Sequence, residues 1–376
     1  ICRMKTTKKI YVKVSIIFLL GGILLFSSCE KEENQKIEAN RKTLFMYLPW
    51  SSNLTNYFYN NISDLEKCIT KIGLNNEKVI VFISTGSTEA MMFEIVSSHG
   101  RCKREILKKY KSPPFTTIDG ITAILNDVKA FAPASVYTMI IGCHGMGWLP
   151  VYEMKVRSAP HMKMHWEYQG VPLTRYFGGL TAEYQTDIKS LASGIANAGM
   201  KMEYILFDDC YMSSIEVAYE LKDVTKYLIG STSEMMAYGM PYAAIGEYLL
   251  GNPDYQSGCE EFYNFYSTYE IMPCGTLAVT DCSELENMAA IIKSINSKYS
   301  FDKSLRGTIQ RLDGYTPVIF YDFADYITSL CNDPILLNQF REQLNHLVPY
   351  KTHTKNFYTM AKGIICLLYT SPSPRD

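Results

Sequence analysis

The sequence contains no Cys-x-x-Cys pair among its 11 cysteines, which argues against a zinc ribbon or a thioredoxin-like redox site. It has no Gly-x-Gly-x-x-Gly fingerprint, because residues 142–147 read Gly-Cys-His-Gly-Met-Gly. His161 and His165 have the spacing of a helical metal pair, but no Glu stands between them as in His-Glu-x-x-His. With 37 basic and 38 acidic residues and no long basic run, the chain does not resemble a nucleic-acid-binding protein.

The N-terminal region has the pattern of an export signal. Residues 1–3 look like upstream readthrough, because Met4 is followed by three lysines and then by the apolar stretch 10–26. This stretch is short for a membrane-spanning helix and ends in Phe-Ser-Ser-Cys. Cys29 after small residues resembles a bacterial lipoprotein cleavage site, so residues 4–29 are expected to be a lipoprotein signal peptide and Cys29 the lipidated residue. An ordinary signal peptide without a lipid is the alternative.

Two further segments, one after the export signal and one at the C-terminal end, also have recognisable patterns. Residues 30–42 are polar and charged and predict a solvated tether. Their acidic start resembles the surface-export signal of Bacteroidetes lipoproteins, which implies a cell-envelope protein, anchored by lipid at the outer-membrane surface. Residues 366–376 resemble a translated sequencing adapter, so the native sequence is expected to be cut short near Ile365.

Between these ends, short apolar runs alternate with amphipathic segments. Near-continuous apolar strands favour an α/β fold with a mostly parallel sheet and helices on both faces. Residues 91–96 and 101–108 predict a small hairpin-like excursion, and the part from 301 to 365 is expected to be mainly helical. Asn53 or Thr55 is the expected cap of the first helix. The main strands are expected at 43–48, 78–84, 137–142, 203–208, 227–231 and 276–280, and the helices at 53–72, 119–131, 186–197, 213–221, 255–269 and 283–299.

Two of these strands lead directly to reactive side chains, His144 after 137–142 and Cys210 after 203–208. Because chemistry collects at the carboxyl ends of parallel strands, the imidazole and the thiol are expected in one crevice. A thiol nucleophile and a neighbouring base are the minimum set of groups required for covalent hydrolysis of an acyl bond. A lone His at a strand end and a buried free Cys are usually structural, but their matching positions favour catalysis.

Residues beside the pair suggest how the reaction is supported. The backbone N–H groups of Gly145 and Cys210 are expected to stabilise the oxyanion. A helix starting near residue 213 would favour the thiolate. Alternation along the strand places Asp208 on the same face as Cys210, where its carboxylate could pair with a basic substrate side chain. Asp209 points the other way and fits a capping or loop-bracing role better.

Three further features are candidates for substrate binding and processing. Glu234 and Tyr242 come after the fifth strand and could line the cleft, although they are equally natural as plain loop residues. The long connection 151–179 lies between the His and the Cys and contains basic residues. These are either solvated charges or points of self-cleavage.

Together these blocks resemble the clostripain family of cysteine peptidases, which are relatives of the caspases. Asp209, Tyr211 and Ser213 depart from the residues common in that family, while both reactive residues are kept. The resemblance covers roughly residues 43–330, and its blocks are Asn53-Leu54, His144-Gly145-Met146-Gly147-Trp148, Asp208-Asp209-Cys210-Tyr211-Met212 with Glu216, Glu220 and Leu221, and Thr232-Ser233-Glu234 through Pro241-Tyr242.

The resemblance implies a caspase-like three-layer sandwich with the peptidase domain at 43–300 and a His144/Cys210 dyad. It implies cleavage of proteins or peptides after Arg or Lys through Asp208, and activation by internal cleavage. The chemistry needs no cofactor; calcium dependence is implied for some members, but no ligands can be assigned. A catalytically silent peptide-binding or adhesive lipoprotein with this fold is the alternative, and an acyltransferase or another Cys–His hydrolase is a third hypothesis.

Overall fold

The computed structural model describes residues 40–51, 53–149, 151, 182–360 and 362–366. The contacts of the chain separate residues 1–39 from residues 40–376, and the described elements all belong to the second unit. Among the described residues, no helix is both long enough and apolar enough to cross a membrane. The expectations for the signal peptide, Cys29, residues 30–39 of the tether, the connection up to residue 179, and His161 with His165 lie outside the described residues, except for Val151. The predicted tether extends too far, because residues 40–42 belong to the first strand, Asn40–Leu48, where Lys42 is buried.

A nine-stranded sheet organises this unit, in the order β4-β3-β2-β1-β5-β6-β7-β8-β9. The five central strands β2, β1, β5, β6 and β7 are parallel to one another. The hairpin β3–β4 and the strands β8 and β9 run antiparallel to their neighbours. The mostly parallel sheet expected from the apolar runs is therefore confirmed. The strands are β1 Asn40–Leu48, β2 Glu77–Ser84, β3 Glu89–Ser98, β4 Arg101–Lys111, β5 Ala134–Ile141, β6 Met202–Phe207, β7 Thr225–Gly230, β8 Thr276–Asp281 and β9 Tyr350–His353.

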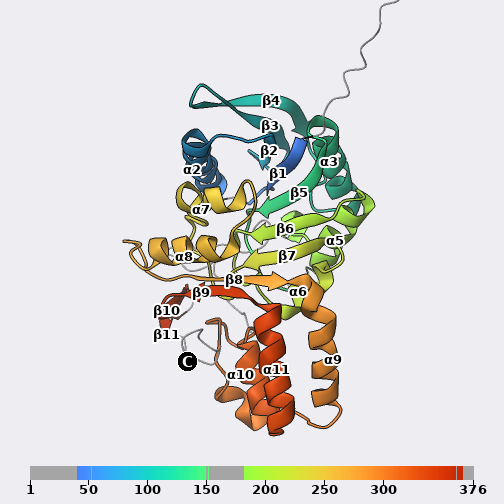
Figure 1. Ribbon diagram of the computed structural model, residues 1–376, viewed down its shortest axis with the longest axis vertical. Helices are drawn as coiled ribbons and strands as arrows, with labels where there is room; N and C mark the ends of the chain where they lie inside the picture. Colours follow the sequence, from blue (N-terminus) through green and yellow to red (C-terminus); the bar gives the residue numbers. More distant parts are fainter. Residues whose placement is uncertain (1–39, 52, 150, 152–181, 361, 367–376) are drawn as a thin grey trace, which may run out of the picture. The chain divides into compact units, whose positions relative to one another are not determined.

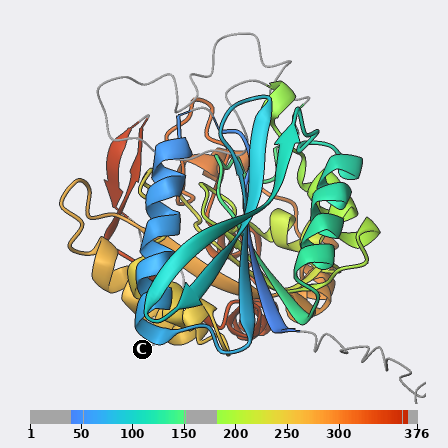
Figure 2. The ribbon, with the colours of Figure 1, turned by 90° about the horizontal axis from the view of Figure 1, so that it is seen from above.

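Helices cover both faces of the sheet, as Figures 1 and 2 show. On β1, Phe45 and Tyr47 face one apolar cluster and Leu44, Met46 and Leu48 face the other, as the two-residue period of a strand requires. The first cluster contains α3 Ile118–Phe131, α5 Ile188–Asn197, α6 Ile215–Leu221, α9 Leu285–Asn296, α10 Phe323–Leu330 and α11 Pro334–Leu347; the second contains α2 Thr55–Ile72, α7 Tyr242–Leu249 and α8 Tyr255–Tyr266.

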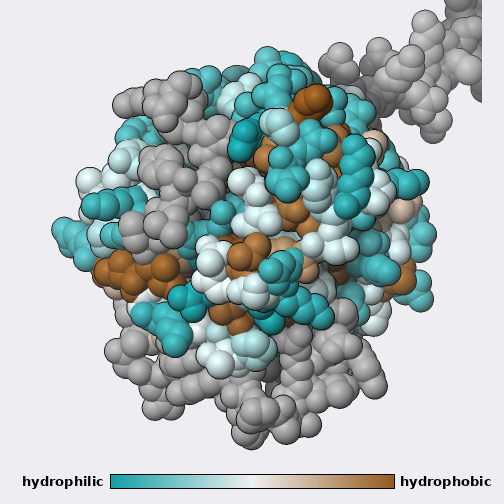
Figure 3. All heavy atoms as spheres, turned by 90° about the horizontal axis from the view of Figure 1, so that it is seen from below, coloured by the Kyte–Doolittle hydropathy of each residue, from teal (hydrophilic) through white to brown (hydrophobic). Residues whose placement is uncertain are grey.

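Several elements differ from the sequence prediction. The hairpin β3–β4 is not a separate excursion but extends the main sheet, because β3 pairs with β2 from Val79 to Ser84. The part after residue 301 contains α10 and α11 but continues into β9, which joins the main sheet, and into a small sheet of β10 Asn356–Thr359 and β11 Gly363–Cys366. The C-terminal part is therefore built into the same fold as the central sheet. Seen from below, apolar residues lie in separate groups among hydrophilic ones, as on most folded proteins (Figure 3).

Candidate active site

The two predicted reactive residues emerge from paired strands. β5 and β6 run parallel with Ile141 opposite Phe207, and the Asp208 N–H continues the ladder by donating to the Ile141 carbonyl at 2.8 Å. His144 and Cys210 each lie three residues after this last pair. The structure thus brings both loops to the same edge of the sheet.

The loops also touch each other through their backbones. A Cβ atom added at Gly145 would overlap the Cys210 carbonyl oxygen and lie 2.8 Å from the Cys210 nitrogen. Gly147 has a φ of +57°, where side chains other than hydrogen are strained, and its position is also crowded by the Phe320 ring. Glycine at these positions lets the His loop lie directly against the Cys loop.

Cys210 is fully buried, and its sulfur is held by backbone groups of the loop after β7. The Met235 N–H donates to Sγ at 3.1 Å, and Sγ lies 3.7 Å from the Met235 carbonyl oxygen. An N–H donor at the sulfur favours the charged thiolate. This donor comes from Met235, and α6 begins only at Ile215, so support from the helix N-terminus is less direct than the sequence suggested.

Other cysteines lie in settings that suppress reactivity. Cys68, Cys259 and Cys282 are buried free thiols. Burial raises the pKa of Cys68 to about 11 and that of Cys259 and Cys282 to about 12. Since the thiolate is the nucleophile, these three thiols remain protonated and unreactive at neutral pH.

His144 is also buried, and its ring is oriented by Asn53. His144 Nε2 lies 2.9 Å from the Asn53 side-chain oxygen. Asn53 was expected as a helix cap, but α2 begins after Leu54, and no side chain makes a capping hydrogen bond there. Sequence reasoning missed this contact; the Asn-Leu block of the family resemblance was the only signal for it.

The two aspartates before the nucleophile have separate partners. Asp208 accepts hydrogen bonds from the Met240 N–H at 2.8 Å and from the Tyr242 hydroxyl at 2.9 Å. Asp209 accepts the Cys143 N–H at 2.6 Å. Asp209 therefore braces the residue before the His, as the alternation of side chains suggested. Asp208 and Tyr242 lie together, although both are buried rather than exposed at a rim.

Glu234 does not line an open cleft. It is buried, accepts the Tyr211 hydroxyl at 3.0 Å, and accepts the Met360 N–H at 3.2 and 3.3 Å through its two oxygens. Burial and the nearby Glu234 carboxylate raise the pKa of Tyr211 well above its ordinary value, so the phenol stays protonated and donates. Tyr211 has a φ of +60°, a left-handed conformation that costs energy for a non-glycine residue.

A C-terminal loop completes this arrangement and was not foreseen from the sequence. Asp313 accepts backbone N–H groups from Tyr315, Ile319 and Phe320, which folds the loop back on itself. The Phe320 ring then stacks on the Tyr211 ring with centroids 4.5 Å apart. The side chain after the nucleophile is thus clamped by Glu234 on one side and by this loop on the other.

No group of three or more His, Cys, Asp or Glu side chains that could hold a metal ion occurs in the part of the chain that the structure describes. The site contains a thiol, an imidazole and backbone donors. These are groups for covalent acyl chemistry.

Comparisons with known proteins agree with this geometry. The profile of the Clostripain family matches residues 46–367. A solved structure of a secreted C11 cysteine protease from Bacteroides thetaiotaomicron, "iotapain", is 58% identical with a TM-score of 0.82, covering 89% of this chain and 92% of its own. A clostripain from Bacteroides thetaiotaomicron in complex with the peptide inhibitor BTN-VLTK-AOMK is 65% identical with a TM-score of 0.51, covering 52% of this chain and 87% of its own.

A more distant structure, an inactive zymogen C11 protease from Parabacteroides distasonis, is 24% identical with a TM-score of 0.73 and covers 88% of this chain and 90% of its own; it shows the fold alone. No curated protein sequence matches the chain. The matched profile spans both reactive loops and most of the sheet. The chain belongs to the clostripain family and is a C11 cysteine protease.

Proposed function

We propose that this protease is an endopeptidase that uses a dyad of Cys210 and His144. The observation that carries the proposal is the backbone contact between the two loops at Gly145. The thiolate attacks the peptide carbonyl and forms a C–S bond, and the backbone N–H groups of Gly145 and Cys210 stabilise the oxyanion. His144 carries the thiol proton to the departing amine, and water then hydrolyses the thioester.

Asn53 is a positioning residue in this proposal. Because its side-chain oxygen accepts from Nε2, the other ring nitrogen, Nδ1, is the one that exchanges the proton with the thiol. The same hydrogen bond stabilises the charged imidazolium.

Replacing Asn53 with Ala is expected to lower kcat by about 10-fold, since one hydrogen bond contributes roughly 0.5–1.5 kcal/mol. The alkaline limb of the pH–rate profile should move to lower pH, because the imidazolium loses support. Asn53→Asp keeps an acceptor and adds negative charge, so its alkaline limb should move to higher pH. Asn56→Ala, at an exposed position in the first turn of α2, is the matched control. An unchanged profile in Asn53→Ala would remove Asn53 from the mechanism.

The proposed substrates are proteins or peptides with Arg or Lys before the scissile bond. Asp208 is a buried carboxylate two residues before the nucleophile, held in place by Met240 and Tyr242. The inhibitor bound to the Bacteroides clostripain has a peptide part, VLTK, that ends in lysine. Glu234, through Tyr211 and Met360, is proposed to hold the wall of the site rather than to touch the substrate.

Replacing Asp208 with Asn keeps the size of the side chain but removes its charge. The value of kcat/KM for Arg- and Lys-containing peptides is expected to fall by about 100-fold, as for other buried charge pairs that lose one partner. A peptide with Gln at the same position serves as the internal comparison, and its hydrolysis should change far less. A variant that still prefers Arg over Gln by the original ratio would exclude Asp208 as the specificity residue.

Three broader parts of the proposal concern the setting of the enzyme. Cys210 and His144 are both buried, so substrate access requires an opening, and cleavage within the connection 151–179 is the proposed trigger.

The protein is proposed to be lipid-anchored at the cell envelope through Cys29, at the outer-membrane surface. Calcium dependence is tested by adding a chelator to the peptidase assay. Loss of activity with the chelator, restored by added calcium, would support it.

The alternative considered from the sequence, a catalytically silent peptide-binding lipoprotein, is disfavoured by membership of the clostripain family. Peptide binding without hydrolysis, in protein that has been cut in the connection, would support this candidate. Hydrolysis that depends on Cys210 would exclude it.

A further inference from the structure

An open pocket is lined by residues that follow the proposed dyad in the sequence, and Asp208 is not part of its lining. It has a volume of about 360 Å³ and is lined by residues from α6, β8, α10 and α11. Both reactive loops contribute to it, through Trp148 on the His loop and through Tyr211 and Ser213 directly after the nucleophile. Asp208 instead bonds Met240 and Tyr242, and none of these three residues lines the pocket. The pocket is therefore distinct from the surroundings of the Asp208 carboxylate.

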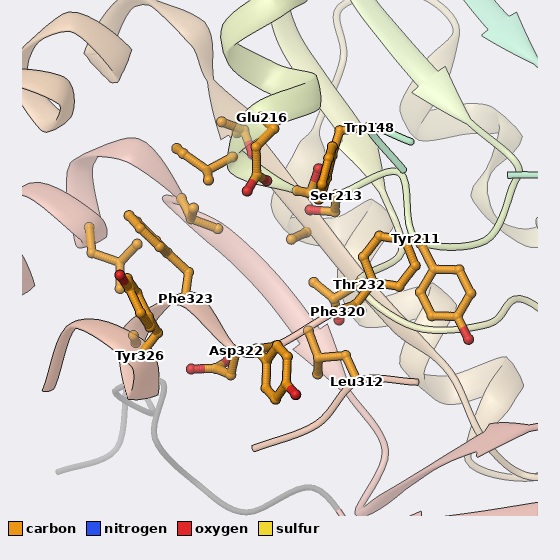
Figure 4. A pocket seen from close by; sticks show the side chains of 18 of the residues that line it. Trp148, Tyr211, Ser213, Glu216, Thr232, Leu312, Phe320, Asp322, Phe323 and Tyr326 are labelled. Carbon is orange, nitrogen blue, oxygen red and sulfur yellow. The ribbon is translucent and has the colours of Figure 1, made fainter. Parts of the chain in front are cut away.

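The walls of the pocket are mainly aromatic and aliphatic. Figure 4 shows Trp148, Ser213 and Glu216 on one side of the space, and Phe323, Tyr326 and Asp322 across from them. A pocket of this volume is within the range of small-molecule sites and can hold one large side chain. Apolar walls favour an apolar occupant through the removal of its surface from water.

The charged groups of the pocket do not make it a site for a cation. Asp322 caps α10 by accepting the Asp325 N–H at 2.8 Å. Lys351 also lines the pocket and adds a positive charge that opposes a cationic occupant. Glu216 is exposed at the rim, where solvent screens its charge.

The position of Trp148 indicates which part of a substrate would reach the pocket. His144 must lie beside the departing amine to protonate it, so the chain after the scissile bond passes along the His loop. Trp148 lies four residues after His144 on that loop, is 43% exposed, and forms part of the pocket wall.

Resting on the endopeptidase function proposed above, we propose that this pocket binds a large apolar side chain of the substrate on the leaving-group side of the scissile bond. The pocket then gives the enzyme a second specificity, for leucine- or phenylalanine-like residues, independent of the charge recognised before the bond. A missing large side chain in such a pocket typically changes kcat/KM by about 10-fold or more.

The test uses internally quenched peptides with Lys before the scissile bond and Gly, Ala, Leu or Phe at each of the next two positions. Phe or Leu should exceed Gly by about 10-fold in kcat/KM at one of these positions. Trp148→Ala and Phe323→Ala should reduce that ratio toward one. Tyr263→Ala, which removes an equally exposed aromatic ring from α8, should keep it.

A second arm measures binding of the same peptides, fluorescently labelled, to the Cys210→Ala protein. The pocket is supported if the Phe peptide binds more tightly than the Gly peptide and if Trp148→Ala removes this difference. This result counts even if the enzyme with Cys210 intact hydrolyses none of the peptides. Absence of hydrolysis by that enzyme would refute the endopeptidase proposal and leave the pocket proposal standing. Hydrolysis with no preference for large apolar residues after the scissile bond would overturn the pocket proposal alone. The pocket proposal would also be overturned if that preference survives both pocket substitutions, or if it is found only at positions before the bond.

Discussion

Cys210→Ala should abolish hydrolysis of Lys- and Arg-containing peptides, with kcat/KM falling by at least about 10⁴-fold, the scale seen when a covalent nucleophile is removed. The sulfur forms the bond to the acyl group in the proposed mechanism, and no methyl group can replace it. The fold should be retained, because the change removes one atom from a site held mainly by backbone contacts.

The matched control is Cys282→Ala. Cys282 is buried like Cys210, but burial raises the pKa of its thiol to about 12, and it lies in the 3₁₀ turn before α9. This variant should hydrolyse the peptides at the original rate. Full activity in Cys210→Ala, measured with purified protein and confirmed by mass, would refute the assigned nucleophile.

Gly145→Ala should lower kcat by about 10²–10³-fold, the cost of misplacing a reacting group or an oxyanion donor. The added methyl group would overlap the Cys210 carbonyl oxygen and lie 2.9 Å from the Cβ of Asp209. One of the two loops must then move, which separates the imidazole from the sulfur. The added strain should also lower the free energy of unfolding by about 1–3 kcal/mol, measurable by urea denaturation.

Gly307→Ala provides the comparison for this prediction, because a Cβ atom there would meet nothing within 4 Å and Gly307 lies in a short 3₁₀ turn far along the chain. It should change neither activity nor stability appreciably. If Gly145→Ala keeps full activity, then the close backbone contact between the loops is not required for the chemistry.

The central sheet and the positions of the two reactive residues could be predicted from local sequence. Apolar runs such as 203–208 indicate strands buried on both faces, and parallel strands place the residues after their carboxyl ends at a common edge. The alternation of side chains also predicted that Asp209 would point away from Asp208, and Asp209 binds Cys143. These predictions succeed because the physical signal lies within a few residues.

The remaining contacts of the site depend on residues far apart in the sequence. Nothing near Glu234 indicates that its carboxylate binds the Met360 N–H, and nothing near Phe320 indicates that its ring stacks on Tyr211. The sequence does not place the hairpin β3–β4 in the sheet, because β4 is rich in charged residues, as is common for an edge strand. Asn53 resembled a helix cap, since caps and side-chain ligands draw on the same residue types.

The bond between Glu234 and Met360 joins residues 126 positions apart. A protein emerges from the ribosome with its amino end first. Cys210 and its loop therefore leave the ribosome well before Met360 has been synthesised. A growing chain therefore cannot form the complete clamp around Tyr211, and the finished geometry of the site belongs only to protein whose synthesis has passed that point.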